Sequence, residues 1–271
     1  MRLRGYTENV PKPMVKIGPR PILWHIMKYY AHFGHKDFIL CLGYKADVIK
    51  RYFLEYDECI SNDFVLADGG DEIELLDSDI SDWRITFVDT GLTACVGERL
   101  MAVREHLDGE DVFLANYADG VTDLYLPDML EYFRAHDKVG CFIGVEPNVS
   151  FHTIATRSDG TVEDIRSARE AGMRINGGYF IFKRSIFDYM RPGEELVEEP
   201  FQRLIEAEEL AAYPYDGFWA CMDTFKEKQL LDDIHKKENA PWEIWRQNRA
   251  PRSRPDALPV HAPSVDGNGH P

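Results

Sequence analysis

The 271-residue sequence has no apolar run near the length of about 18 residues that a membrane-spanning helix needs. It is also poor in basic residues: 31 lysines and arginines stand against 47 aspartates and glutamates, for a formal charge of −16. This charge repels nucleic acid and anionic membrane surfaces, so we expect neither as a partner. A phosphate ligand would then need a local cluster of Lys, Arg and backbone N–H groups, helped by a metal ion.

Cysteine is scarce as well. The five cysteines are odd in number and widely spaced, and they form no C-x-x-C. They indicate neither a zinc site nor a disulfide framework and suit a reducing compartment, so we expect a cytoplasmic protein. No G-x-G-x-x-G follows an apolar strand, which argues against a dinucleotide-binding dehydrogenase. The opening stretch MRLRGYTENVPKPMVKIG has early arginines and no apolar segment, unlike a secretory signal.

The pattern of apolar residues predicts the fold class. Short continuous apolar runs such as DFILCLGY alternate with amphipathic stretches such as RPILWHIMKYYAHFG. This alternation predicts an α/β fold built on a doubly wound, mainly parallel (Rossmann-like) sheet. The acidic stretch 56–82 is predicted to be a loop or a hairpin. Beyond residue 150, Asp159–Gly160 lies between two alternating stretches and predicts a hairpin in a small β-rich portion.

The sequence divides into one domain and a tail. Residues 1–246 carry all of the periodic segments and are predicted to form a single domain. Residues 247–271 hold five of the fifteen prolines and show no periodicity. We therefore expect this C-terminal stretch to be a disordered, Pro-rich tail.

Two aspartates follow apolar stretches and are candidate metal ligands. Asp119 ends the strand FLANYAD, at the carboxyl edge where doubly wound sheets bind ligands, and Asp223 follows GFWACM. Two such carboxylates suit Mg²⁺, which binds to one or two protein carboxylates together with substrate phosphates. The alternatives are structural: Asp119–Gly120 as an ordinary turn, and Asp223 as the N-cap of the following helix.

Two further segments are candidates for ligand contact. Lys12 lies between Pro11 and Pro13, which stiffen the backbone, and a lysine that must meet a phosphate benefits from such rigidity. An ordinary exposed lysine is the alternative. The Asn176–Gly177–Gly178 stretch at the start of a strand indicates either close approach of a ligand or a bulge.

Together these segments resemble a known family. The stretches PKPMVKIGPRPILWHIM, GERL, NYADGVTDL, INGGYFIF and DGFWACMDTF occur in the order found in sugar-phosphate nucleotidyltransferases, most closely their glucose-1-phosphate cytidylyltransferase branch. The resemblance covers roughly residues 2–246. It implies the nucleotidyltransferase type of fold, with the β-rich portion binding the sugar, and transfer of a nucleotidyl group from an NTP to a sugar 1-phosphate, releasing pyrophosphate. CTP and glucose 1-phosphate are favoured as substrates, and a homo-oligomer is implied.

The resemblance also implies roles for individual residues. Asp119 and Asp223 would hold Mg²⁺, and Lys12 would contact the phosphates at the reacting centre. The residues implied near the nucleotide are Arg2, Lys12, Arg99 and Asp119. The residues implied to face the sugar are Asn176, Gly177, Glu198 and Glu199.

The start of the chain departs from the family pattern. Members begin with an apolar strand and a G-G-x-G-T-R-L loop around the nucleotide, whereas this sequence starts at the loop's last three residues, with Arg2 and Leu3 matching its end. Such a strand buries three or four aliphatic side chains, contributing roughly 5–12 kcal/mol in all. We therefore expect a misplaced start or a truncated gene, or else an inactive relative that only binds a ligand or partner.

Two internal departures concern specificity. Ala94 and Val96 stand where the family usually carries hydroxyl groups close to the nucleotide. The family's lysine before INGG is missing, and Arg166 or Arg169 is the nearest cation. Arginine is bulkier and planar, so it is no simple replacement for lysine. The sequence therefore leaves the base and the sugar open.

Overall fold

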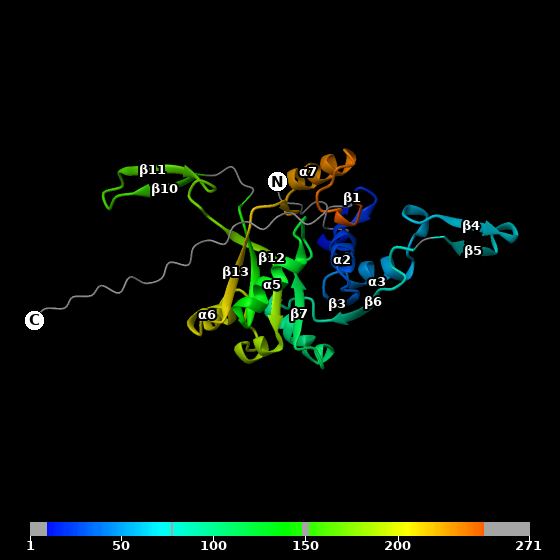
Figure 1. Cartoon of the computed structure of the whole chain (residues 1–271), viewed down its shortest axis with the longest axis horizontal. Helices are drawn as coiled ribbons and strands as arrows, with labels where there is room; N and C mark the ends of the chain where they lie inside the picture. Colours follow the sequence, from blue (N-terminus) through cyan, green and yellow to red (C-terminus); the bar gives the residue numbers. More distant parts are fainter. Residues whose placement is uncertain (1–9, 77, 148–151, 247–271) are drawn as a thin grey trace, which may run out of the picture.

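The structure, a computed structural model, describes residues 10–76, 78–147 and 152–246 (Figure 1). Arg2 and the predicted tail at 247–271 lie outside the described residues. Within those ranges no helix combines the length and apolar character needed to cross a membrane. Helices and strands alternate along the chain, and α5 and α6 pack on β13. The predicted α/β class is confirmed.

The largest sheet has four strands in the order β13–β9–β12–β7. β13 runs parallel to β9, whereas β12 is antiparallel to both β9 and β7. The chain leaves β9, forms a hairpin and returns as β12 in the opposite sense, so this sheet is mixed. Residues 177–182 of β12 are all buried, in keeping with their continuous apolar run. The bounds are β7 Val112–Asn116, β9 Gly140–Val145, β12 Ile175–Lys183 and β13 Leu210–Tyr215.

A second, parallel pair consists of β3 (Asp37–Leu42) and β6 (Arg84–Asp89). In the described part of the chain no strand ladder joins this pair to the four-stranded sheet. The parallel pairing expected from the sequence is thus found in β3–β6 and in β13–β9, and the remaining ladders are antiparallel.

Helix α2 (Ile22–His32) lies at the centre of the molecule, beneath α7 in Figure 1. Nine of its eleven residues are buried, as expected of a helix enclosed on all sides. Pro21 is its extended N-cap residue and belongs to the short strand β2. The other helices are α3 Ala46–Leu54, α4 Val96–Ala102, α5 Leu126–His136, α6 Glu199–Glu206 and α7 Phe225–Lys236.

Two hairpins project from opposite sides of the body in Figure 1. The β10–β11 hairpin confirms the turn predicted at Asp159–Gly160, where Gly160 has a φ of +86°. The acidic stretch 56–82 contains the other hairpin, β4–β5. The bounds are β4 Phe64–Ala67, β5 Glu72–Leu75, β10 His152–Thr156 and β11 Val162–Ser167, with β1 Lys16–Ile17 and β2 Arg20–Pro21 completing the smaller ladders.

Candidate active site

A short antiparallel ladder brings two distant aspartates together. β8 (Gly120–Thr122) pairs with β14 (Trp219–Cys221), with Gly120 opposite Cys221. Just beyond this pair, the Met222 N–H donates to the Asp119 carbonyl at 2.9 Å. Asp119 and Asp223 therefore emerge from the same end of the ladder.

Lys12 joins this pair from the N-terminal part of the chain. Its Nζ lies 2.7 Å from Asp119 Oδ2 and also contacts Asp223 Oδ1. Lys12 begins a single 3₁₀ turn preceded by extended Pro11, and Met14 anchors the turn in the core. The proline-flanked backbone thus holds the Lys12 ammonium between two carboxyl groups.

The backbone before Asp119 adopts an unusual conformation. Ala118 has a φ of +62°, in the left-handed region, which costs a non-glycine residue about 1–2 kcal/mol. The Asn116 side chain stabilises this bend by accepting the Ala118 N–H at 2.7 Å. The bend turns the chain from β7 into β8 and directs Asp119 toward Lys12. Asp119 therefore follows a bend with a left-handed residue and directly precedes β8, and is not simply the first residue of a common turn.

The charges of the cluster influence one another strongly. Burial acts to lower the pKa of Lys12, but Asp119 and Asp223 more than offset it, so this pKa is raised. Burial raises the pKa of Asp119 above its usual range, and Lys12 opposes that effect. Burial and the ion pair with Lys12 thus act in opposite directions on the pKa of Asp119.

The carboxylates fit a divalent cation. The Lys12 ammonium already draws Asp119 and Asp223 around a shared positive charge, and carboxylate oxygens are the ligands that Mg²⁺ prefers. Ligand atoms of Cys221, Asp223 and Glu227 also lie within 4.8 Å of one another. Of these, Glu227 Oε2 is already occupied by the N–H groups of Asp223 and Thr224 at 2.8 Å each.

The start of α7 decides between two interpretations of Asp223. The N-cap residue is Thr224, which forms a reciprocal capping box with Glu227. The interpretation of Asp223 as the N-cap is therefore wrong, and its carboxylate remains available to Lys12. Glu227 was missed in the sequence, although the T-x-x-E spacing signals it.

The candidate sugar-binding segment forms a bulge. The register of β12 against β9 shifts between Asn176 and Phe180, and Gly178 has a φ of +75°. Asn176 Nδ2 donates to the Tyr117 hydroxyl at 3.3 Å, two residues before Asp119. Gly177 is buried, and Trp219 Nε1 donates to its carbonyl at 2.8 Å. The segment therefore borders the aspartate cluster through Tyr117, a residue that the sequence did not single out.

Three other candidates lie elsewhere. Arg99 donates to the Leu42 carbonyl at 3.2 Å and to Thr90 Oγ1 at 2.8 Å, at the carboxyl ends of β3 and β6. Glu198 and Glu199 are exposed at the start of α6, where they line a separate cavity of about 570 Å³. The contacts described for these residues do not connect them to Lys12.

Solved structures share this fold. The chain superposes on UDP-glucose pyrophosphorylase complexed with UDP-glucose with a TM-score of 0.60 at 13% identity, over 86% of this chain and 93% of that one. HddC from Yersinia pseudotuberculosis gives a TM-score of 0.58 at 17% identity, over 84% and 91%. These similarities establish the architecture alone.

Curated sequences are more similar. The glucose-1-phosphate cytidylyltransferase of Salmonella typhimurium is 37% identical over 250 residues, covering 90% of this chain and 95% of that protein. The probable glucose-1-phosphate cytidylyltransferase of Bacillus subtilis is 33% identical over 246 residues, with the same coverage. No protein-family model matches the chain. At these identities, over nearly the full length of both relatives, the chain belongs to the glucose-1-phosphate cytidylyltransferase family of sugar-phosphate nucleotidyltransferases.

Proposed function

We propose that this protein transfers the cytidylyl group of CTP to glucose 1-phosphate, giving CDP-glucose and pyrophosphate. The observation that carries the proposal is the Lys12–Asp119–Asp223 cluster, found in a chain 37% identical to a glucose-1-phosphate cytidylyltransferase. Three segments far apart in sequence converge there and provide one ammonium and two carboxylates.

The reaction requires positioning and charge rather than a protein nucleophile. A phosphate oxygen of the sugar 1-phosphate attacks the α-phosphorus of CTP in line, and the bond from that phosphorus to the pyrophosphate oxygen breaks. Lys12 would neutralise charge that develops on the α-phosphate and hold it in place. Its rigid 3₁₀ turn limits the entropy lost in doing so.

Asp119 and Asp223 would hold Mg²⁺, which when bound neutralises phosphate charge and aligns the two substrates. The Ala118 bend and the β8–β14 ladder fix the direction from which each carboxylate approaches. No other titratable side chain is required as a general base, because the attacking phosphate oxygen is already ionised at neutral pH.

We also propose which residues bind the two substrates. Asn176 and Gly177, beside Tyr117 and the cluster, would border the sugar. Arg99, at the carboxyl ends of β3 and β6, would approach the nucleotide. Glu198 and Glu199 as sugar ligands, Arg2 as a nucleotide ligand, a cytoplasmic location and a homo-oligomer stay predictions.

The test is pyrophosphate release by the purified chain with Mg²⁺, glucose 1-phosphate and each of CTP, UTP, dTTP, ATP and GTP in turn. We expect release with CTP and at least tenfold less with the others. Release with another nucleotide would keep the reaction class and reassign the base. No release with any nucleotide from folded protein would refute catalysis and leave the binding-only alternative.

A further inference from the structure

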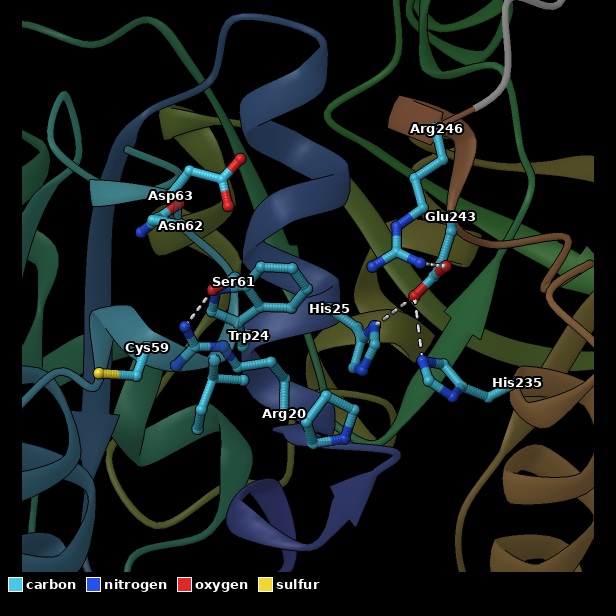
Figure 2. Close-up of a pocket in the computed structure, with 12 residues that line it drawn as sticks. Arg20, Trp24, His25, Cys59, Ser61, Asn62, Asp63, His235, Glu243 and Arg246 are labelled. Carbon is cyan, nitrogen blue, oxygen red and sulfur yellow. Dashed lines mark hydrogen bonds and ion pairs between the residues drawn. The ribbon is translucent and has the colours of Figure 1, made fainter. Parts of the chain in front are cut away.

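A second cavity, of about 300 Å³, lies away from the Lys12 cluster. Figure 2 shows it between the loop 59–63 on one side and residues 235–246 on the other, with Arg20, Trp24 and His25 between them. None of the aspartates or the lysine of the candidate active site lines it. Its size is about ten times the roughly 30 Å³ that one water molecule occupies in the liquid.

The cavity gathers unsatisfied polar atoms. Among the described residues, three buried side-chain atoms lack a hydrogen-bond partner: Arg20 Nε, Asn62 Oδ1 and Glu243 Oε1. All three residues line this cavity, and they are only 2%, 8% and 5% exposed. Leaving a buried donor or acceptor unpaired costs about 1–3 kcal/mol. Three such atoms around one cavity indicate a place where a ligand completes the hydrogen bonding.

The other polar atoms of these side chains are already engaged. Arg20 donates through its Nη atoms to the Tyr52 hydroxyl at 3.3 Å and the Asp57 carbonyl at 3.0 Å. Asn62 Nδ2 donates to Asp79 at 3.1 Å, and Glu243 Oε2 pairs with an Arg246 Nη at 3.2 Å. These contacts therefore hold the three side chains, and with them the three unpaired atoms, in place.

The histidines cannot satisfy Glu243 directly. His25 Nδ1 accepts from Trp242 Nε1 at 3.3 Å, which leaves it no proton for the carboxylate 3.8 Å away. His235 Nε2 lies 3.6 Å from Glu243 Oε1, beyond hydrogen-bond distance (Figure 2). Neither histidine therefore donates a hydrogen bond to Glu243 Oε1, and a ligand donor would satisfy this oxygen.

The unpaired atoms define the chemistry of the ligand. Arg20 Nε needs an acceptor, whereas Asn62 Oδ1 and Glu243 Oε1 need donors. Hydroxyl groups supply both. A phosphate has few or no protons to give, and the carboxylates of Asp63 and Glu243 offset the charges of Arg20 and Arg246 at the cavity, which leaves no net positive charge to hold an anion. We propose that this cavity is a second ligand site for a neutral polyhydroxyl group of monosaccharide size, either a free hexose or the sugar end of a nucleotide sugar.

Cys59 provides a direct probe, because it is exposed and lines the cavity. Iodoacetamide labelling of the full chain, followed by peptide mass spectrometry, reports each cysteine separately. We expect 50 mM glucose to slow labelling of Cys59 at least threefold and to leave Cys95 unchanged. Parallel reactions with CDP-glucose and with CTP separate the two sources: slowing by CDP-glucose at lower concentration than glucose identifies a nucleotide sugar.

Two variants make the test specific. Ile60 lines the cavity, and Ile60→Trp should fill it and abolish the protection of Cys59. Leu54→Trp, at a leucine that is 83% exposed and outside the cavity, is the matched control and should keep the protection. Both should release pyrophosphate at rates within twofold of the parent chain.

Several outcomes would overturn the proposal. Unchanged labelling of Cys59 at 100 mM glucose and with CDP-glucose would mean that the cavity holds water only. Equal protection by inorganic phosphate would make it an anion site. Slowing at Cys221 without slowing at Cys59 would place the sugar at the candidate active site alone.

Discussion

Lys12 and Asp119, 107 positions apart in the sequence, are joined by a 2.7 Å ion pair that Asp223 shares. The ammonium lies against the same oxygens that would hold a divalent cation. Close binding of Mg²⁺ by both carboxylates and this three-membered ion pair therefore exclude each other. On the proposed function, Lys12 would have two alternative partners, the carboxylates of the free protein and the phosphates of the substrate.

The first prediction concerns Lys12→Met. Nucleotidyl transfer should fall by about 10²–10³, the usual effect of removing one charge-stabilising donor. The free protein should bind Mg²⁺ more tightly, because a competing cation is gone. Stopped-flow pyrophosphate release and calorimetric titration with Mg²⁺ measure the two effects. Lys16→Met, at an exposed lysine four residues away, should change neither. Weaker Mg²⁺ binding by Lys12→Met would contradict the competition between Lys12 and Mg²⁺ for the two carboxylates.

The second prediction concerns the carboxylates. Asp119→Asn and Asp223→Asn keep the shape of the side chain but remove its charge. Each should lower transfer at least 100-fold and raise the Mg²⁺ concentration needed for half-maximal rate. Asp71→Asn, an exposed aspartate near the β4–β5 turn, is the matched control and should behave as the parent. An unchanged Mg²⁺ requirement in both site variants would remove these aspartates from the metal site.

The third prediction concerns Tyr117. The variant Tyr117→Phe loses the hydroxyl that accepts the Asn176 amide, at a cost of about 0.5–1.5 kcal/mol. KM for glucose 1-phosphate should rise roughly two- to tenfold, while KM for CTP stays constant. Tyr132→Phe, whose hydroxyl bonds to Ala212 at an exposed position, is the control. A change in KM for CTP alone would indicate that Asn176 contacts the nucleotide and not the sugar.

The fourth prediction is a pH dependence of stability. Burial lowers the pKa of His25 to about 3, and its ring is neutral in the folded protein. In the unfolded chain the His25 ring takes up a proton below its ordinary pKa of about 6.5, whereas the folded chain keeps the ring neutral. The contribution of His25 to the free energy of unfolding is therefore fully present above pH 6.5 and is lost as the pH falls. Between pH 7 and pH 5 it amounts to about 2 kcal/mol, from 1.36 kcal/mol per pH unit.

Urea unfolding at pH 7 and pH 5 measures this effect. The parent chain should lose about 2 kcal/mol more unfolding free energy over that range than His25→Gln, which removes the titrating ring. His136→Gln, at an exposed histidine of α5, is the control for the loss of an imidazole as such. Equal losses in the parent and His25→Gln would show that folding does not lower the pKa of His25.

The fifth prediction concerns Gly177→Ala. A Cβ at this position would lie 3.0 Å from Ile143, 3.1 Å from Val145 and 3.2 Å from Trp219. Overpacking of this kind costs about 1–3 kcal/mol, measured as a lower urea midpoint. Gly144→Ala is the control in the neighbouring strand, because its Cβ would meet atoms no closer than 3.7 Å. Unaltered stability of Gly177→Ala would show that the bulge can relax.

Local patterns single out the three residues that the structure brings together, whereas they do not encode the strand order of the four-stranded sheet. Asp119, Asp223 and Lys12 were identifiable because each stands at a junction between an apolar run and a loop, or between two prolines, and such junctions are local features. The mixed order of the four-stranded sheet depends on how β12 returns after β10–β11, and no local pattern encodes that direction.

Other features could not be predicted because they depend on contacts between segments far apart in the sequence. The β8–β14 ladder has only three residues in each strand, too few for a periodic pattern, yet it determines which aspartates meet. The buried face of Gly177 depends on Ile143 and Trp219, which come from other strands. The N-cap at Thr224 was readable from its T-x-x-E spacing and was overlooked.

The contact between Lys12 and Asp223 spans 211 positions, which has a consequence for the order of events during synthesis. At about 5–20 residues per second, the ribosome makes Asp223 roughly 10–40 s after Lys12. Until then the lysine and Asp119 lack their third member, and α7 is not yet available to support β1. On the proposed function, the nascent chain should not act on nucleotides until Asp223 and helix α7 have been made.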